Sequence, residues 1–319
     1  MKYAWWLLLL LGCPGGESPP PQPPAPPPVV VVPTLPPPLP LGPLITVRGV
    51  PWPSNARYDN TKLTAHTRID ARTASWIGQL TQAVRYGGGP NVHWSGGRIT
   101  GTFPDSTSWS TYHDHYAFVI RGAPGTVVEG VRIHNYGDTF SFDAVGSEGW
   151  TVRGNHVSYI HDDCLSNDFG NSGLVDDNLF DGCYMGYSSR AYAGFVADNR
   201  HKVVVFRGNL IRLQDMPTGY ARPGHGRFWK MNSSDGSGGD PRLALHDNIF
   251  RMDTDNSCCG NFFIPPPAYL ASCANNIIVW LGPGDFPEPI PSCFRVTRDR
   301  AVWDDAVAAW LERHPNVAP

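Results

Sequence analysis

The chain has 319 residues, of which 41% are hydrophobic and 17% are charged, and its formal net charge is −3. This weak negative charge argues against a nucleic acid as a general partner. Once two unusual N-terminal segments are set aside, the remaining length is sufficient for one large domain with a single core.

The first twelve residues are typical of an export signal. A lone Lys2 precedes an almost unbroken apolar run over residues 3–11, which is too short for a membrane-spanning helix. The run ends in the sequence LLGC at residues 10–13, which resembles the bacterial lipoprotein box. That resemblance implies removal of residues 1–12 and a lipid on Cys13, whereas an ordinary secretory signal is the alternative. We therefore expect an exported protein, either secreted or attached to the cell envelope through this lipid alone.

Residues 13–44 have the composition of a stalk. About half of them are proline. Such a segment has few backbone donors, favours the extended polyproline conformation and cannot pack a core. We predict a semi-rigid linker, followed by one folded domain over residues 45–319.

A helix is predicted at residues 73–85. Apolar side chains recur there at helical spacing, and three glycines at residues 87–89 follow as a stop signal.

A short phrase recurs six times between residues 127 and 279. Each copy has apolar β-formers, an Asn or Gly, and further apolar residues, and successive copies are 23 to 39 residues apart, with these reference positions: Gly130, Asn155, Asn178, Asn209, Asn248 and Asn276. One such coil cannot bury its own apolar face, but a stack of coils shares a continuous core. Asn and Gly tolerate left-handed backbone angles, and a stacked Asn side chain can bond the backbone of the neighbouring coil.

The repeat therefore predicts an all-β fold, a single-stranded right-handed parallel β-helix. A β-sandwich is the alternative, although the recurring Asn in one phase of the pattern argues against it. A second helix is predicted at residues 302–313, before His314 and a proline. The open ends of a solenoid need covering, so we interpret the helices at 73–85 and 302–313 as caps.

Besides Cys13, the chain has an even set of cysteines, which agrees with export to an oxidising compartment: Cys164, Cys183, Cys258, Cys259, Cys273 and Cys293. Up to three disulfides are expected. Cys164 with Cys183, and Cys273 with Cys293, are each about one coil apart and are the predicted pairs. No Cys or His spacing has the regular form of a structural zinc site.

Four aspartates stand at matching positions in two successive coils. Asp138 and Asp163 each follow the reference residue by eight positions, and Asp143 and Asp168 each follow it by thirteen. If the coils carry no offset, each pair stacks about 4.8 Å apart. Like charges at that distance need a shared proton, a cation or a basic side chain, so Asp138, Asp163 and Asp168 are candidate Ca²⁺ ligands. The alternative is that they are solvated turn residues.

With its glycine-rich opening at residues 96–101, the predicted β-helix resembles the pectin-lyase-like superfamily over residues 70–300. Within it, Asp162-Asp163-Cys164-Leu165 is similar to the Asp-Asp-Cys-Ile of polygalacturonase-type glycoside hydrolases. The resemblance implies that these carboxylates act as general acid and as the base that activates water.

The same family carries an Asn-x-Asp on the preceding coil, to which Asn135 with either Asp138 or Asp143 would correspond. The chain departs from the family one coil after the Asp pair. Gly-Cys-Tyr stands at residues 182–184 where the family has Gly-His-Gly, and a Gly-His-Gly occurs only at residues 224–226.

The longest excursion between repeats, from Asn209 to Asn248, is rich in cationic and aromatic side chains, and its residues 227–230 are a loose counterpart of the family's Arg-x-Lys. Aromatic rings suit the faces of sugars, and Arg suits their carboxylates. A surface loop whose rings fold back onto the scaffold is the alternative. We assign substrate binding to His161, Arg222, His225, Arg227, Trp229 and Lys230.

These residues lead to two hypotheses of different class. The first is a surface-anchored enzyme acting on a polysaccharide, expected to be anionic, with Asp143, Asp162, Asp163 and Arg190 as catalytic residues. Hydrolysis would use the carboxylates as acid and base, whereas elimination would use them to bind Ca²⁺, with Arg190 or Lys230 as the base. Arg190 also has a simpler interpretation as a counter-charge. The second hypothesis is a non-catalytic glycan-binding or adhesive module. The sequence does not indicate an oligomeric state.

Overall fold

The computed structural model describes residues 42–47, 56–189, 197–217, 224–255 and 262–317. The chain divides into two compact units, Met1–Leu39 and Pro40–Pro319, and every described strand and helix belongs to the second. That unit is mostly β. Its described α-helices are α1 (Trp109–His113) and α2 (Ala301–Arg313), and a 3-10 turn covers Pro267–Tyr269. No described helix has the length and apolar content that crossing a membrane requires.

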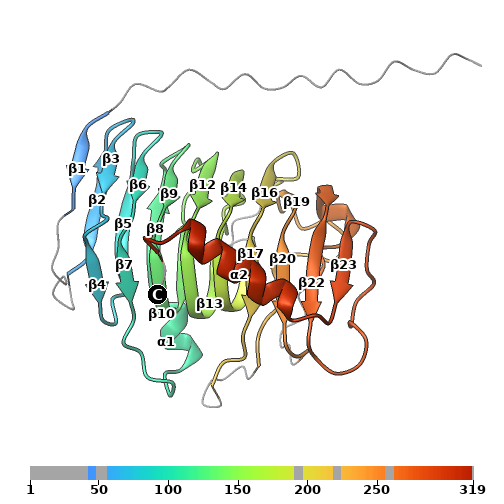
Figure 1. Ribbon diagram of the computed structural model, residues 1–319. Coiled ribbons are helices and arrows are strands. Elements are labelled where there is room, and N and C mark those ends of the chain that lie inside the picture. The colour runs from blue at the N-terminus through green and yellow to red at the C-terminus, as the bar shows by residue number, and fades with distance from the viewer. Residues whose placement is uncertain (1–41, 48–55, 190–196, 218–223, 256–261, 318–319) are drawn as a thin grey trace, which may run out of the picture. The chain divides into compact units, whose positions relative to one another are not determined.

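The described strands form two large parallel sheets (Figure 1). The first sheet has nine strands, in the order β1 (Leu44–Thr46), β3 (Arg68–Asp70), β6 (His93–Ser95), β9 (Val127–Glu129), β12 (Trp150–Arg153), β14 (Gly173–Asp176), β16 (Val203–Arg207), β19 (Arg242–His246) and β21 (Leu270–Ala274).

The second sheet has fourteen described strands. Ten of them follow one another in the order β2 (Tyr58–Leu63), β5 (Gln82–Gly88), β8 (Tyr116–Arg121), β11 (Asp138–Phe142), β13 (His156–Ser166), β15 (Leu179–Ser188), β17 (Leu210–Leu213), β20 (Ile249–Met252), β22 (Asn276–Trp280) and β23 (Phe294–Thr297). The other four pair beside this path: β4 (Ser75–Ile77), β7 (Arg98–Thr100), β10 (Arg132–Tyr136) and β18 (Trp229–Lys230).

From β12 to β17 the chain visits the two sheets alternately, so neighbouring strands of one sheet are separated in sequence by a strand of the other. This arrangement is compatible with the predicted β-helix. One continuous core contains buried aromatic residues contributed by both sheets, among them Trp94, Phe118, Trp150 and Phe206. The ring of Phe142 stacks on Trp150 with centroids 4.2 Å apart, which ties the second sheet to the first. Because the core is closely packed between the two sheets, the strands of both sheets are rigid supports for surface side chains.

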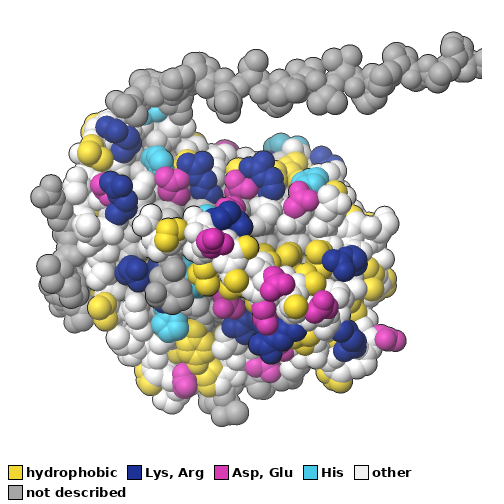
Figure 2. All heavy atoms as spheres, in the orientation of Figure 1, with side chains coloured by type: hydrophobic (Ala, Val, Ile, Leu, Met, Phe, Trp, Pro, Cys, Tyr) yellow, Lys and Arg dark blue, Asp and Glu magenta, His cyan; other side chains and the backbone are white. Residues whose placement is uncertain are grey.

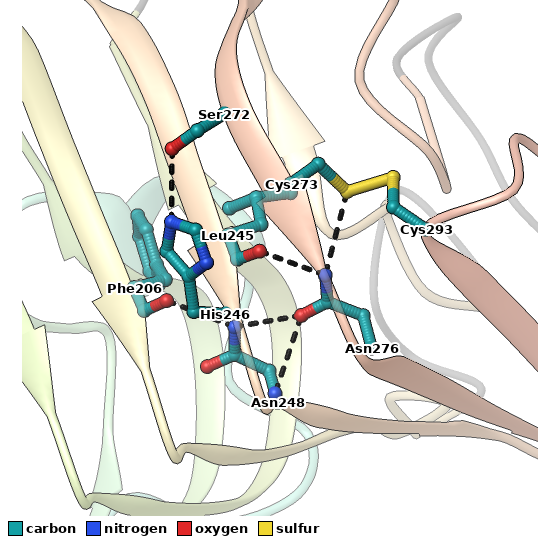
Figure 3. Close-up of a disulfide and its surroundings, with 8 residues drawn as sticks. All are labelled: Phe206, Leu245, His246, Asn248, Ser272, Cys273, Asn276 and Cys293. Atoms are coloured by element: carbon teal, nitrogen blue, oxygen red, sulfur yellow. Dashed lines mark hydrogen bonds between the residues drawn. A yellow bond between two sulfur atoms is a disulfide. The ribbon is translucent and has the colours of Figure 1, made fainter. Parts of the chain in front are cut away.

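A ladder of five asparagines runs through the interior along the start of the second sheet's strands: Asn155, Asn178, Asn209, Asn248 and Asn276, each at most 1% exposed. At each step, one side-chain oxygen accepts from both the backbone N–H and the side-chain amide of the preceding Asn; for Asn178 and Asn209 these distances are 3.1 and 2.9 Å. Figure 3 shows the last step, between Asn248 and Asn276. The predicted bonding between coils is confirmed.

The ladder corrects one detail of the sequence interpretation. The asparagines themselves do not have left-handed backbone angles. The residue before each of them does, with φ of 58° at Gly154, 50° at Asp177 and 62° at Gly208. The bend is therefore made by one residue and the hydrogen-bonded stack by the next.

Both predicted disulfides are present. Cys164 bonds Cys183 and Cys273 bonds Cys293, so each bond joins segments about one coil apart. The second bond lies beside the end of the asparagine ladder (Figure 3). Two disulfides fit an oxidising environment. Cys13, Cys258 and Cys259 lie outside the described residues.

The helix predicted at residues 73–85 is wrong. The segment forms β4 and the beginning of β5, which pair in parallel with β7 and β8. Trp76 and Val84 point into the core and are at most 1% exposed. Five apolar residues at helical spacing also fit two short buried strands. Pairing with neighbouring strands favours the strands over the helix.

The helix predicted at residues 302–313 is confirmed as α2, but its predicted place as an end cap is wrong. Trp303 and Trp310 form a separate apolar cluster with Leu179, Leu210 and Val279, which belong to β15, β17 and β22. The helix thus crosses the outer face of the second sheet, as Figure 1 shows. Hydrophobic side chains gather on this face where α2 crosses the strands (Figure 2).

Candidate functional site

The acidic residues meet where β11, β13 and β15 run side by side. In the β11–β13 pairing, Phe140 lies opposite Leu165, and this register places Asp138 beside Asp163. The backbone N–H of Asp163 donates to Asp138 Oδ1 at 2.8 Å. The stacking of these two residues, predicted from their equal distance to the reference positions, is present in the structure.

An extra residue in β13 brings the second aspartate to the same place. Tyr136 lies opposite Ile160 in the β10–β13 pairing, so β13 contains one more residue than its neighbour before Leu165 is reached. The pairing with β15 is irregular at the same point, between Ile160 and Asp163. Successive side chains of a regular strand point to opposite faces, but a bulge removes that alternation. Asp162 and Asp163 consequently both bring a carboxylate oxygen to within 4.8 Å of one on Asp138.

Two basic side chains reach this cluster from other segments. Lys230, on β18, lies in register with Ser188 of β15, and its Nζ is 3.1 Å from Asp163 Oδ2. His113, at the end of α1, places Nδ1 2.7 Å from Asp162 Oδ2. We refer to Asp138, Asp162, Asp163, Lys230 and His113 as the acidic cluster. The side chain of His113 is 45% exposed whereas those of Asp162 and Asp163 are 4% exposed, so the cluster is reached from the side of the histidine.

Burial of several carboxylates in one place changes their protonation. Burial, and then the charges of Asp162 and Asp163, raise the pKa of Asp138 well above its ordinary value. Burial also raises the pKa of Asp163, to about 7, although the Lys230 ammonium opposes this shift. The pKa of Lys230 is itself raised, because the attraction of Asp163 and its neighbours outweighs the cost of burying the ammonium. The lysine therefore stays charged, and at least one carboxyl carries a proton near neutral pH.

His113 is shifted toward its charged form, whereas Asp138 and Asp163 are shifted toward their neutral forms. Its hydrogen bond to Asp162 raises the pKa of the imidazole, which favours an imidazolium facing a carboxylate. The ring is held by Trp109, which stacks on it at 4.5 Å, and α1 begins with a cap in which Ser108 Oγ accepts from the Thr111 N–H. A protonated carboxyl and an ionised one in the same site are the two partners that general acid and base catalysis requires.

A cleft of about 370 Å³ lies next to the cluster and is lined by residues of β5, β8 and β11 and by Asp143, Asp168 and Phe169, whereas none of the five cluster residues lines it. Tyr116 on β8 forms part of its wall and lies in register beside Asp138. Asp143 and Asp168, which their equal spacing predicted to stack on successive coils, both line it. Asp143 forms an ion pair with Arg121, and Asp168 accepts from the Ser188 hydroxyl at 3.2 Å. We refer to this space as the β8–β11 cleft. Asp143 therefore lies beside the acidic cluster rather than in it.

Of the predicted substrate-binding residues that the structure describes, only Lys230 joins the acidic cluster. His225 and Trp229 are each 1% exposed, and Trp229 packs on Phe206 in the core with ring centroids 5.0 Å apart. Their predicted contact with a ligand is corrected: the rings fold back onto the scaffold because burial of large apolar surface is favourable. Arg227 is paired with Glu288 at 2.7 Å, away from the aspartates. Arg190 and Arg222 lie outside the described residues.

His161 is also corrected to a supporting position. It is fully buried, its ring stacks on Tyr112 at 3.7 Å, and its Nε2 lies 2.9 Å from Asn135 Oδ1. Burial lowers its pKa to about 3, so the ring is neutral. It fixes the strand directly before Asp162, and Asn135 acts in that support rather than at the carboxylates.

Sequence patterns do not connect His113 to the site. The two histidines at residues 113 and 115 are by themselves only a weak metal-binding pattern. His113 follows an insertion after β7, and no repeat spacing relates it to Asp162 on β13. The contact depends on how that insertion folds.

Three comparisons with known proteins add no identification. No protein-family model matches the chain, and searches of curated proteins and of solved structures found no match either.

Proposed function

We propose that this chain is an exported right-handed parallel β-helix that hydrolyses the glycosidic bonds of a polysaccharide. The observation that carries the proposal is the convergence of Asp138, Asp162 and Asp163 within 4.8 Å, beside a cleft. Asp163 has a pKa of about 7 there, which suits a proton donor at neutral pH. The pectin-lyase-like resemblance of the Asp-Asp-Cys-Leu sequence supports the same chemistry.

The roles follow from the hydrogen bonds of each group. The protonated carboxyl of Asp163, coupled to Asp138, gives its proton to the oxygen of the departing sugar. Asp162, held by His113, takes a proton from the attacking water. Lys230 keeps the charge of the cluster balanced as these protons move. Two carboxyls with opposite protonation are the usual requirement of glycoside hydrolysis.

Elimination has less support than hydrolysis. It needs a base that removes a carbon-bound proton, and the raised pKa of Lys230 makes its ammonium a poor one. The other candidate base, Arg190, lies outside the described residues.

Calcium at Asp138, Asp163 and Asp168 does not fit the described residues. Calcium takes six to eight oxygen ligands. The carboxylates that come together are Asp138, Asp162 and Asp163, without Asp168, and the Lys230 ammonium already pairs with Asp163. We derive no step through a metal ion.

A glycan-binding module without catalysis is the competing proposal. Such a module does not require its carboxylates to converge, whereas those of Asp162 and Asp163 meet on one side of the scaffold beside Lys230. The stalk at residues 13–44 and a lipid on Cys13 would attach the enzyme to the cell envelope. Both remain proposals from the sequence.

The test is incubation of the full chain with a panel of neutral, acidic and amine-bearing polysaccharides. We expect new reducing ends without the ultraviolet absorbance of unsaturated sugars, which elimination would produce. Asp162→Asn and Asp163→Asn should abolish the activity, whereas Asp176→Asn, on the first sheet, should retain it. Absence of cleavage in the whole panel, or cleavage that both site variants retain, would exclude the proposed hydrolysis.

A further inference from the structure

The backbone bend that precedes the acidic cluster is made by an unusual residue. Asn135, Tyr159 and Gly182 stand at matching positions on successive coils, and each has a left-handed backbone, with φ of 54°, 53° and 108°. Asn and Gly adopt this conformation readily, whereas a bulky aromatic residue meets steric repulsion there. An Asn or a Gly at position 159 would make the same bend without that cost. Such an exception points to a role for the side chain of Tyr159.

The ring of Tyr159 packs on a residue of the bulge. His161 is the first of the two residues in β13 at which the pairing with β15 becomes irregular, and Asp162 is the second. The ring of Tyr159 meets the ring of His161 edge-on, with centroids 4.5 Å apart, and Tyr112 of α1 stacks on the same histidine at 3.7 Å. His161 is therefore held by two aromatic rings, one from its own strand and one from α1. Rings that pack in this way favour one orientation of the side chain between them.

The hydroxyl of Tyr159 joins β13 to the segment that carries His113. We refer to residues 101–115, which lie between β7 and β8 and contain α1, as the α1 insertion. The Tyr159 hydroxyl donates a hydrogen bond of 2.7 Å to Asp105 Oδ1 in this insertion. A hydrogen bond to an ionised carboxylate is stronger than one between neutral groups. Tyr159 thus contacts both the bulge and the insertion.

Three residues close together on β13 contact the α1 insertion in succession: Tyr159 contacts Asp105, His161 contacts Tyr112, and Asp162 contacts His113. The first two contacts lie outside the acidic cluster, and the third belongs to it. All three join the same two segments of the chain. The distance between His113 and Asp162 therefore depends on how the first two contacts hold the insertion against the strand.

We propose that Tyr159 and Asp105 are positioning residues of the acidic cluster, which hold the bulge and the α1 insertion in the arrangement that lets His113 orient Asp162. Both act through these two residues and not by contact with the substrate. The inference rests on the proposed hydrolysis, in which Asp162 takes a proton from the attacking water. A tyrosine at this bend holds two parts of the site together, which the side chain of an Asn or a Gly could not do.

The first test separates the hydroxyl from the bend and the ring. Tyr159→Phe keeps the ring and removes the hydrogen bond to Asp105. With the polysaccharide that the full-length wild type cleaves, we expect kcat to fall about three- to tenfold and KM to change by less than about twofold. Asp105→Ala should have the same effect, whereas Asp105→Asn keeps an accepting oxygen and should retain at least about half of the wild-type kcat. An unchanged kcat in Tyr159→Phe would overturn the inference, as would an equal loss in the two Asp105 variants.

The second test does not depend on turnover. The His113 imidazole is titrated by NMR in the full chain labelled at histidine, and its signal is identified by its absence from His113→Gln. The hydrogen bond to Asp162 raises the pKa of His113, so Tyr159→Phe should lower this pKa by about 0.5, whereas Asp105→Asn should leave it in place. An equal pKa in the wild type and in Tyr159→Phe would overturn the inference. A lowered pKa would support it even if no polysaccharide is cleaved, so the failure of this inference and the failure of the proposed hydrolysis are distinguishable.

Discussion

Two stacks of polar side chains run across the strands of this protein, and they behave in opposite ways. Inside, five asparagines form a ladder in which each side-chain oxygen after the first accepts two hydrogen bonds from the asparagine before it. Outside, aspartates stack in the same manner, but burial and mutual repulsion raise the pKa values of Asp138 and Asp163. Asparagine and aspartate differ only at the end of the side chain, which is an amide in the first and a carboxyl group in the second.

The difference lies in what each side chain offers its neighbour. An amide carries donors and an acceptor, so a row of amides is satisfied by its own members and by nearby backbone carbonyls, without protons or cations. An ionised carboxylate carries only acceptors, so a row of carboxylates requires protons or cations from elsewhere. The asparagine ladder therefore contributes stability, while the aspartate stack holds protons that a reaction can use.

The largest effect that follows from this comparison is on catalysis. Asp163→Asn gives the stack an amide that cannot donate a proton to the substrate, so we expect hydrolysis to fall by about 10²- to 10⁴-fold. The unfolding free energy should remain equal or rise at neutral pH, because a mutual repulsion is removed. Reducing-end assays and urea denaturation measure the two quantities on one preparation. A loss of activity accompanied by an equal loss of folded protein would instead show that Asp163 is structural.

The next effect is on stability and tests the ladder. Asn209→Ala leaves the backbone N–H and the side-chain amide of Asn178 without their acceptor, and it removes the side-chain N–H donors to Asn248 Oδ1 and the Val175 carbonyl. Because one or more buried groups become unsatisfied, we expect the unfolding free energy to fall by about 2–4 kcal/mol. Asn60→Ala, at a half-buried asparagine outside the ladder that accepts from the Lys62 N–H, should cost less than about 1 kcal/mol. Equal losses in the two variants would mean that the ladder contributes no special stability.

The repeat predicted the parallel sheets and the ladder, because both depend on residues within one coil and on its spacing. It also predicted the Asp138–Asp163 contact, but through two errors that cancel. Gly130 matches Gly154 in phase rather than Asn155, since both have left-handed angles. Counted from the matching glycines, Asp163 stands one position further along than Asp138. The bulge before Leu165 puts one extra residue into β13, and this brings Asp163 opposite Asp138.

Other parts of the site depend on contacts that no spacing encodes. The His113–Asp162 hydrogen bond joins residues 49 positions apart through the fold of an insertion. The rings of Trp229 and Phe228 were equally suited to sugar and to core, and burial decided for the core. The helix at 73–85 failed for a similar reason, because strand pairing outweighed a local pattern. Short-range patterns therefore predicted the scaffold better than the surface.

A smaller effect concerns the pH dependence of stability. The pKa of Asp163 is about 7 in the folded chain against an ordinary value of 3.8, so the folded state binds the proton more tightly. The resulting stabilisation is complete below pH 4 and is lost as the pH rises toward 7. We expect this group to lower the unfolding free energy by about 1–2 kcal/mol between pH 5 and 7. Chemical denaturation of the wild type and of Asp163→Asn at each pH should show that the substitution removes this slope. A slope that is equal in both proteins would place the titration elsewhere.

The smallest effect is expected at the edge of the aspartate stack, where His113 orients Asp162. His113→Gln keeps a side chain able to donate but removes the imidazolium, so we expect a loss of about tenfold in kcat with little change in KM. The pH profile distinguishes this role from a structural one. The hydrogen bond to Asp162 raises the pKa of the His113 imidazole, so kcat should fall as this group loses its proton at higher pH, and the variant should lack that fall. His115→Gln is the matched control, since His115 lies two residues away and bonds the Thr111 carbonyl instead of an aspartate. If the shape of the pH profile is unchanged while kcat falls, His113 supports the α1 segment and does not act through its charge.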